Sequence, residues 1–257
     1  MQNWLGLEII GKDARDFLQR LTTLPVSKYS PGDGARGLLL NPMAKAFGSF
    51  TLLCLAAQRF VLIFETEEEF TRVKEEFERL HFAENLEMRA LGGEGGVLQE
   101  KKSLPSFVCE ENGNFFWRWF SDDRVAAFGK NLPALLSFED TESERIELGE
   151  SKWGAEFGPE VNVLDAGLFD RLPGNKGCYP GQEVVERSLS VGHPARAMIQ
   201  VKGDCELGAA LSVDGKDVGK ITSVSPRGVY ALAIVQWKYR EEMSFDHQGR
   251  KIVRCHK

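Results

Sequence analysis

The sequence predicts an α+β protein that ends in a small antiparallel β-barrel. Two observations lead to this prediction. Up to about residue 91, strand patterns of period two alternate with helix patterns in which apolar side chains recur three and four residues apart. After residue 195 the chain carries only short strand patterns separated by turn residues, which is typical of a small antiparallel barrel or sandwich.

The first part of the chain is expected to form a ferredoxin-like module. Strand patterns lie at residues 4–10, 35–40, 47–56, 59–64 and 86–91, and helix patterns lie at 13–21 and 66–80. The second helix begins with the capping-box residues Thr66 and Glu69, and Phe70, Val73 and Phe77 recur along one of its faces. We interpret this series as containing the order β-α-β-β-α-β, the ferredoxin-like split unit.

Three modules are expected along the chain. They are a ferredoxin-like module at 1–95, a second α+β module at 96–195 that is interleaved with the first, and a small β-barrel with a charged tail at 196–257. The glycine-rich segment 92–96 lacks the spacing of a nucleotide-binding loop and predicts a flexible link. The residues after about 240 are rich in charge, and we expect them to be partly disordered.

Residues 114–120 form the most aromatic segment of the chain. Three adjacent aromatic residues must point to both faces of a strand, so we expect a strand that is buried on both sides. The alternative is an exposed platform for a planar ligand or a base.

Composition and charge limit the classes of function. The chain has 257 residues, a formal net charge of −6 and a pI near 5.4. Broad nucleic-acid binding depends on neutralising phosphates, so this charge argues against it. No apolar run approaches the ~20 residues of a membrane helix, and residues 1–4 carry no basic region typical of a secretory signal or a transit peptide. We therefore expect a cytoplasmic protein that does not enter a membrane.

The five cysteines are widely spaced, at Cys54, Cys109, Cys178, Cys205 and Cys255. No Cys-Xaa-Xaa-Cys pair is present, so we do not expect this chain alone to hold zinc or an iron–sulfur cluster, and no stably bound metal is expected. The number is odd and we expect no export signal, which argues against a disulfide framework.

The most informative segment for function is residues 176–183, Lys-Gly-Cys-Tyr-Pro-Gly-Gln-Glu. The ammonium group of Lys176 and a helix N-terminus expected near Gly181 both favour the thiolate form of Cys178. We therefore predict a reactive thiol assisted by Lys176. The alternative is a tight loop around a buried and inert cysteine.

The other residues of this segment are expected to shape the loop. Gly177, like Gly181, allows the backbone to turn sharply. Tyr179 is a candidate to stack on a ligand or to donate a hydrogen bond to it. Gln182 and Glu183 are expected to stabilise the loop through backbone hydrogen bonds at the helix N-terminus.

Segment 176–183 resembles the signature of the YgfZ family, Lys-Gly-Cys-aromatic-Xaa-Gly-Gln-Glu, at every fixed position. That family is related to the T-protein, the aminomethyltransferase of the glycine cleavage system. The likeness extends thinly over most of the chain, through residues 7–22, 38–41, 145–149, 219–223 and 231–233, and is weakest between about 95 and 140.

The resemblance implies a T-protein-like fold, tetrahydrofolate as the ligand, and a role in assembling or repairing iron–sulfur clusters in other enzymes, including tRNA-modifying enzymes. The thiol of Cys178 would then carry out redox chemistry or bond transiently to a partner protein or cluster. Two alternatives stay open. One is a folate-dependent aminomethyltransferase, and the other is a noncatalytic adaptor that docks a partner through the aromatic segment.

The resemblance also argues against aminomethyl transfer. T-proteins rely on an aspartate in a pair shortly after the strand that corresponds to residues 38–41. In this chain the pair falls on Gly48 and Ser49, and neither side chain carries a carboxylate. We therefore expect this protein not to be a classical aminomethyltransferase.

Several residues are candidates for contacts with folate. Glu147 matches a T-protein position, and a carboxylate can accept two hydrogen bonds from an aminopyrimidine edge; the alternative is a solvated glutamate at a helix end. Arg145 is a candidate for the ligand or for a structural role. Lys45, Arg187 and Arg196 are unranked candidates for the anionic glutamate tail of folate.

Overall fold

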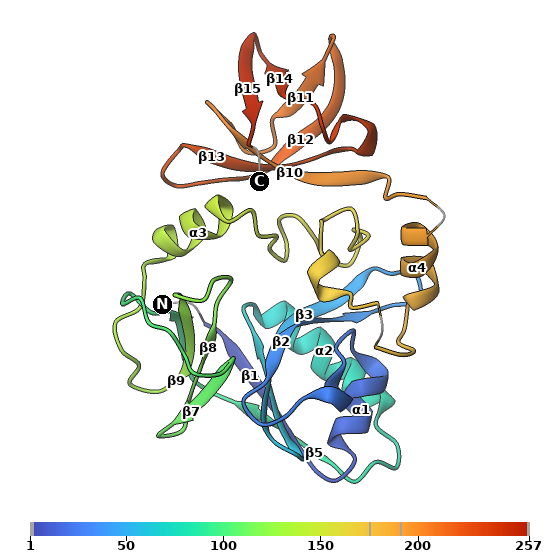
Figure 1. Ribbon diagram of the computed structural model, residues 1–257, viewed down its shortest axis with the longest axis vertical. Helices are drawn as coiled ribbons and strands as arrows, with labels where there is room; N and C mark the ends of the chain where they lie inside the picture. Colours follow the sequence, from blue (N-terminus) through green and yellow to red (C-terminus); the bar gives the residue numbers. More distant parts are fainter. Residues whose placement is uncertain (1–2, 175, 191, 256–257) are drawn as a thin grey trace. The chain divides into compact units, whose positions relative to one another are not determined.

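The computed structural model describes residues 3–174, 176–190 and 192–255, which form two compact units (Figure 1). The first unit comprises Met1–Pro42, Ala46–Ser137 and Asp170–Gln182, and the second comprises Met43–Lys45, Phe138–Phe169 and Glu183–Lys257. The expected division into three modules stays a prediction. No helix in the described ranges is both long and apolar enough to cross a membrane.

The first unit is built around a five-stranded antiparallel sheet with the order β2-β3-β4-β1-β5. Its strands are β1 (Leu5–Ile10), β2 (Gly34–Leu40), β3 (Ala46–Ala56), β4 (Arg59–Phe64) and β5 (Glu87–Leu91). The helices of this unit are α1 (Ala14–Leu21), α2 (Glu67–Leu80) and the short 3-10 helix η1 (Val26–Lys28). The sheet has one strand more than the four-stranded split unit, because β2 adds to its edge beside β3.

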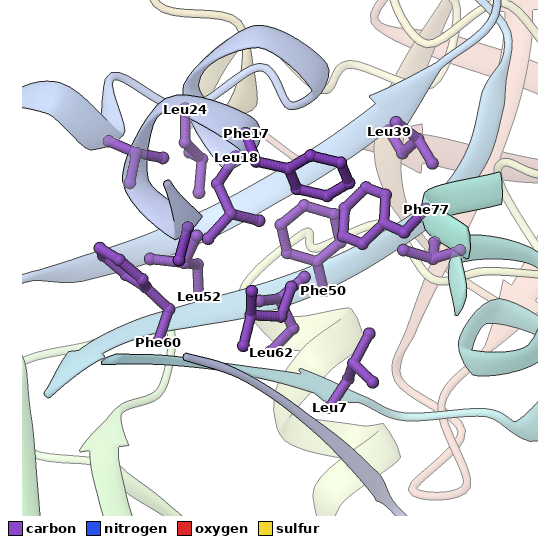
Figure 2. Packing of buried hydrophobic residues seen from close by; sticks show 14 of the residues in the cluster. Leu7, Phe17, Leu18, Leu24, Leu39, Phe50, Leu52, Phe60, Leu62 and Phe77 are labelled. Atoms are coloured by element: carbon purple, nitrogen blue, oxygen red, sulfur yellow. The ribbon is translucent and has the colours of Figure 1, made fainter. Parts of the chain in front are cut away.

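Helices α1 and α2 bury one face of this sheet. Phe17 of α1 and Phe77 of α2 lie edge to face, with ring centroids 5.4 Å apart, and pack with Phe50, Leu52 and the other strand side chains shown in Figure 2. This core follows from the sequence pattern, since apolar residues at period two in the strands meet apolar residues three and four apart in the helices. The predicted cap is also confirmed, because the Thr66 side chain accepts a hydrogen bond from the backbone N–H of Glu69 at 3.2 Å.

A second sheet of the first unit covers the other face. Its order is β6-β9-β8-β7, with β6 (Glu94–Val97), β7 (Val108–Glu111), β8 (Asn114–Arg118) and β9 (Val125–Gly129). Phe115 and Trp117 point into the core shared with the main sheet, whereas Phe116 packs on the opposite side with Leu98 and Leu104. The aromatic segment is therefore buried on both faces, as predicted, and is not an exposed platform.

The glycine-rich segment is not the flexible link that the sequence suggested. Gly95 and Gly96 belong to strand β6 and pair with β9. A Cβ atom added at Gly95 would lie 2.6 Å from the ring of Trp4. These glycines are thus explained by close packing between the two sheets, which a count of glycines does not reveal.

The second unit contains a closed antiparallel barrel with the order β10-β13-β12-β11-β14-β15. Its strands are β10 (Arg196–Lys202), β11 (Ala210–Val213), β12 (Lys216–Val224), β13 (Tyr230–Gln236), β14 (Ser244–His247) and β15 (Arg250–Arg254). The remaining helices of the chain are α3 (Phe138–Glu147), α4 (Gln182–Ser190) and the short 3-10 helices η2 (Phe169–Arg171) and η3 (Trp237–Tyr239).

The predicted barrel is confirmed, but the expectation of a partly disordered tail is wrong for the described residues, and residues 256 and 257 lie outside the described ranges. Strands β14 and β15 form a hairpin that closes the barrel. Phe245 and Ile252 point inward and are at most 1% exposed, while the charged residues between them point out. The turn at Gln248 and Gly249 has positive φ angles of 48° and 81°, as a two-residue hairpin requires. The high charge of this segment reflects one solvated strand face.

Candidate functional site

Cys178 lies in an exposed loop of the first unit, four positions before the start of α4. The other four cysteines are buried or half-buried. The loop needs its two glycines, because Gly177 and Gly181 have φ angles of +94° and +82°. Its last turn is closed by a hydrogen bond from the Gln182 N–H to the Tyr179 carbonyl at 3.2 Å. The thiol is therefore accessible, and the backbone that carries it is defined.

The buried side chain of Lys176 holds this loop in place. Its side chain is only 5% exposed, and its Nζ donates to the carbonyl oxygen of Gln19 and, at 3.5 Å, to that of Cys178. Burial lowers the pKa of Lys176 to about 8, and the nearby Cys178 acts in the opposite direction. Tyr179 is also buried, and its ring centroid lies 5.2 Å from the Lys176 Nζ. The structure thus brings the three predicted residues Lys176, Cys178 and Tyr179 together.

Gln19 of helix α1 completes this arrangement, and sequence reasoning did not assign it. Its Nε2 donates to the Lys176 carbonyl at 2.7 Å, and its Oε1 accepts from the Ser27 N–H at 2.9 Å. Gln19 therefore fixes the backbone of the loop across 157 residues of sequence. A single polar residue in an amphipathic helix gives no signal of such a distant contact.

The last two residues of the predicted segment stand at the start of α4. Glu183 forms an exposed ion pair with Arg187 one turn later, with 2.9 Å between Oε1 and Nη2. This is an ordinary helix-surface pair at spacing i,i+4.

The residues predicted to contact folate belong to the second unit. Arg145 is 3% exposed, and its guanidinium contacts Glu142 at 3.1 Å, Glu156 at 3.2 Å and the Ser223 hydroxyl at 3.0 Å. These contacts connect α3 to the barrel strand β12 within the unit. These contacts are typical of a structural residue, and a structural role was one of the two predicted for Arg145.

Glu147 and the three candidate cations are accessible. Glu147 Oε1 lies 3.4 Å from Arg227 Nη1, and Lys45 Nζ lies 3.1 Å from Glu160 Oε2. Arg196 is exposed, and its backbone N–H donates to Asp165 at 3.1 Å. Arg187 is exposed beside Glu183. Their contacts with folate stay predictions.

A carboxyl group from another element lies against Gly48 and Ser49. Glu69 of α2 is 2% exposed, and its Oε1 accepts the Ser49 N–H at 3.2 Å and the Ser49 hydroxyl. Gly48 permits this approach, since a Cβ there would lie 2.6 Å from Val73 of the same helix. Burial raises the pKa of Glu69 to about 7. The capping-box pattern marked Glu69, but only as a helix cap.

The first unit also has a cleft of about 420 Å³, and its lining includes Arg36, Arg118, Phe107 and Phe120 together with the carboxylates of Asp122 and Asp170. The Arg36 guanidinium stacks on the Phe120 ring, 4.3 Å from its centroid, and lies 2.9 Å from Asp170. Arg118 contacts Asp122 at 3.2 Å, while its Nε is buried without a hydrogen-bond partner in the described part of the chain. Phe120 has a φ of +54°, which is uncommon for an aromatic residue. Sequence reasoning missed this cleft, because its residues are far apart in the chain.

No group of three or more His, Cys, Asp or Glu side chains within the described ranges is placed to hold a metal ion.

Comparisons with known proteins identify the fold. No protein-family model matches this chain. Over 84 residues it is 38% identical to a chloroplastic protein of Arabidopsis thaliana named a "putative transferase", and the match covers 32% of this chain and 19% of the plant protein. Among solved structures it is similar to the glycine cleavage system aminomethyltransferase T of Bartonella henselae, with a TM-score of 0.82 and 19% identity over 100% of this chain and 83% of that chain. The chain therefore has the T-protein-like α+β fold, with an antiparallel barrel at its C-terminal end.

Proposed function

We propose that this protein binds reduced folate and supports the assembly or repair of iron–sulfur clusters in client enzymes, including tRNA-modifying enzymes, through the thiol of Cys178. The observation that carries the proposal is the exposed Cys178 thiol on a loop fixed by Lys176 and Gln19. Cys178 is exposed, and the two glycines define the turn of the loop that carries it, so a protein partner can reach the thiol. Its thiolate sulfur is also the usual protein ligand of iron in clusters.

The fold and the cleft of the first unit support tetrahydrofolate as the ligand. Folate consists of a flat pterin, an aminobenzoyl ring and a glutamate tail with carboxylates. The guanidinium groups of Arg36 and Arg118 match carboxylates, and Phe107 and Phe120 match an aromatic ring. A volume of about 420 Å³ is within the range of small-molecule sites. The solved relative is an aminomethyltransferase of the glycine cleavage system.

The residues of the second unit are a separate, alternative proposal for the same ligand. There Glu147 is proposed for the pterin edge, with Arg145 holding the helix that carries it, and Lys45, Arg187 and Arg196 for the anionic tail. We further propose that the protein works in the cytoplasm with iron–sulfur client or assembly proteins, and without direct broad binding to nucleic acids.

A calorimetric titration with tetrahydrofolate under anaerobic conditions tests the ligand. The proposal expects saturable heat with a dissociation constant below about 1 mM, which corresponds to a binding free energy of about −4 kcal/mol. Absence of saturable heat up to that concentration would refute folate binding. The role of the thiol is tested separately, because it does not depend on the titration.

A second function is favoured by Glu69. Its buried carboxyl group lies against Ser49, where T-proteins carry the paired aspartates, and its raised pKa of about 7 suits a general acid or base. A folate-dependent aminomethyltransferase with a displaced acid is therefore the alternative. Formation of methylene-tetrahydrofolate from an aminomethyl donor, lost in Glu69→Gln and kept in Glu67→Gln, would establish it and would replace the primary proposal.

A further inference from the structure

Strand β5 forms one edge of the five-stranded sheet, and among the described strands only β1 pairs with it. Met88 packs partly buried against the core on the helix side of the sheet, so Ala90, two residues further on, lies on the same face. Ala90 is nevertheless exposed, and so are Glu87 and Arg89 on the opposite face. This edge is therefore open to solvent on both faces of the sheet, and an open edge is a template for pairing with another chain.

The backbone groups that β5 offers to another chain follow from its neighbour. The Gly11 N–H donates to the Gln58 carbonyl at 3.0 Å, so every second residue of β1 before Gly11 bonds toward β4. The alternate residues of β1 bond toward β5, where they lie opposite its odd-numbered residues. Met88 and Ala90 therefore direct their N–H and carbonyl groups outward, and no described residue hydrogen-bonds to these groups.

The exposed charges of β5 are complementary to those of a second copy of the same strand. Glu87 and Arg89 lie two residues apart on one face and pair with each other, with 2.6 Å between Oε2 and Nη2. Charges of one sign would repel an identical strand, whereas β5 carries one of each sign. When two copies of β5 run antiparallel about a two-fold axis at Met88, Glu87 of each copy lies opposite Arg89 of the other.

The same register satisfies the outward backbone groups. Met88 lies opposite Met88 of the second copy, and each donates its N–H to the carbonyl of the other. The Ala90 N–H meets the carbonyl of Leu86 in the second copy. The Glu87–Arg89 pairs then occupy the positions without backbone hydrogen bonds, where side chains of opposite strands lie closest. A two-fold axis at Arg89 would also match the backbone groups, but it would place Arg89 opposite itself, which is unfavourable.

We propose that β5 pairs with β5 of a second copy of this chain, antiparallel about a two-fold axis at Met88, so that the two five-stranded sheets form one continuous sheet. Backbone hydrogen bonds hold the strands together, and the Glu87–Arg89 pairs determine the register. One short strand from each copy makes a small interface, so the dimer is weak, with a dissociation constant of about 10 µM to 1 mM. The proposal depends neither on folate binding nor on the thiol of Cys178.

Analytical ultracentrifugation of the full-length protein under reducing conditions, from about 5 µM to about 1 mM, tests the proposal. Arg89→Glu brings only carboxylates together at the centre of the interface, and Glu87→Arg brings only guanidinium groups together. Each should raise the dissociation constant at least about tenfold. Arg79→Glu is the control, because it makes the same change of charge at an exposed arginine of α2 that pairs with Glu76, and it should leave the constant unchanged.

A mixture of the two charge variants tests the register. In a mixed dimer of Arg89→Glu and Glu87→Arg every facing pair again has opposite charges, so the mixture should associate at least as tightly as the wild type. This recovery also shows that both variants are folded. Ala90→Pro removes an outward N–H and should weaken the dimer, whereas Ala90→Ser keeps it and should not.

Three results would overturn the proposal. The first is a wild-type protein that stays monomeric over the whole concentration range. The second is a dimer that survives both charge substitutions, because it would then form through another surface. The third is a mixture of the two charge variants that associates no better than either variant alone.

Discussion

Lys176 and Gln19 exchange two hydrogen bonds, one from the buried Lys176 amine to the Gln19 carbonyl and one from the Gln19 amide to the Lys176 carbonyl. This reciprocal contact fixes the loop that carries Cys178 to helix α1. It gives Lys176 a second role beside the predicted electrostatic one, because the amine contacts the carbonyl oxygen of Cys178 and holds the backbone in place.

Removal of the Gln19 side chain should loosen this loop. Gln19→Ala deletes the bonds to the Lys176 carbonyl and to the Ser27 N–H, so we expect a loss of about 1–3 kcal/mol in the free energy of unfolding. Urea denaturation measures it. Asp16→Ala, an exposed position on the same helix, is the control and should change the stability by less than about 0.5 kcal/mol. Equal effects of the two substitutions would contradict the conclusion that the Gln19 side chain fixes the loop.

Because of Lys176, the free energy of unfolding should depend on pH in the alkaline range. Its pKa is about 8 in the folded protein, below the ordinary 10.5, so the unfolded chain binds more protons between these values. Stability should then rise with pH from about 8 to about 10.5, by roughly 1 kcal/mol or more. The rise should be absent in Lys176→Met, with unfolding followed by urea at several pH values. If the wild type and the variant run parallel across this window, the buried amine is not the cause.

Glu69 should change the free energy of unfolding with pH in the opposite direction, and in a lower pH range. Its folded pKa of about 7 lies above the ordinary 4.5, so the folded protein holds the extra proton between these values. Stability should fall as the pH rises from about 4.5 to about 7, by roughly 1 kcal/mol or more. Glu69→Gln cannot ionise and should lose this dependence, whereas the exposed Glu67→Gln should keep it. The same slope in Glu69→Gln as in the wild type would refute the assignment.

The arginine-lined cleft should determine folate affinity. Arg36→Ala and Arg118→Ala each remove a charged hydrogen-bond donor, so the dissociation constant for tetrahydrofolate should rise about 10- to 100-fold. Arg89→Ala, an exposed arginine of the same unit paired with Glu87, should have no effect. Calorimetry measures all three variants. Wild-type affinity in both cleft variants would place the ligand elsewhere.

Much of the fold could be predicted from local patterns. The capping box at Thr66 and Glu69 and the period-two strand patterns predicted helix α2 and the strands of the five-stranded sheet, because these signals act within a few residues. The errors have a common physical cause. Gly95 and Gly96 looked like a linker and proved to be a closely packed strand, and the charged tail proved to be one face of a hairpin. In both cases tertiary packing determines the conformation of the segment, and the local amino-acid composition does not reveal that packing.

The candidate site was predictable only in part. The thiol and its two glycines stand in one continuous segment, so their chemistry could be inferred from sequence. Gln19, Glu69 and the cleft residue Arg36 act on segments far from them in the chain. A single sequence carries no record of which distant residues meet, so these contacts required the structure.

The most direct test of the central claim is replacement of Cys178 in a strain that depends on this protein, with the activity of its iron–sulfur enzymes as the readout. Cys178→Ala changes an exposed loop residue and should alter the stability by only about 0.5 kcal/mol, which thermal unfolding can verify. We predict that this variant, although folded, fails to restore those enzyme activities, while the matched variant Cys109→Ala restores them. Full restoration by Cys178→Ala would contradict the proposed role of the thiol.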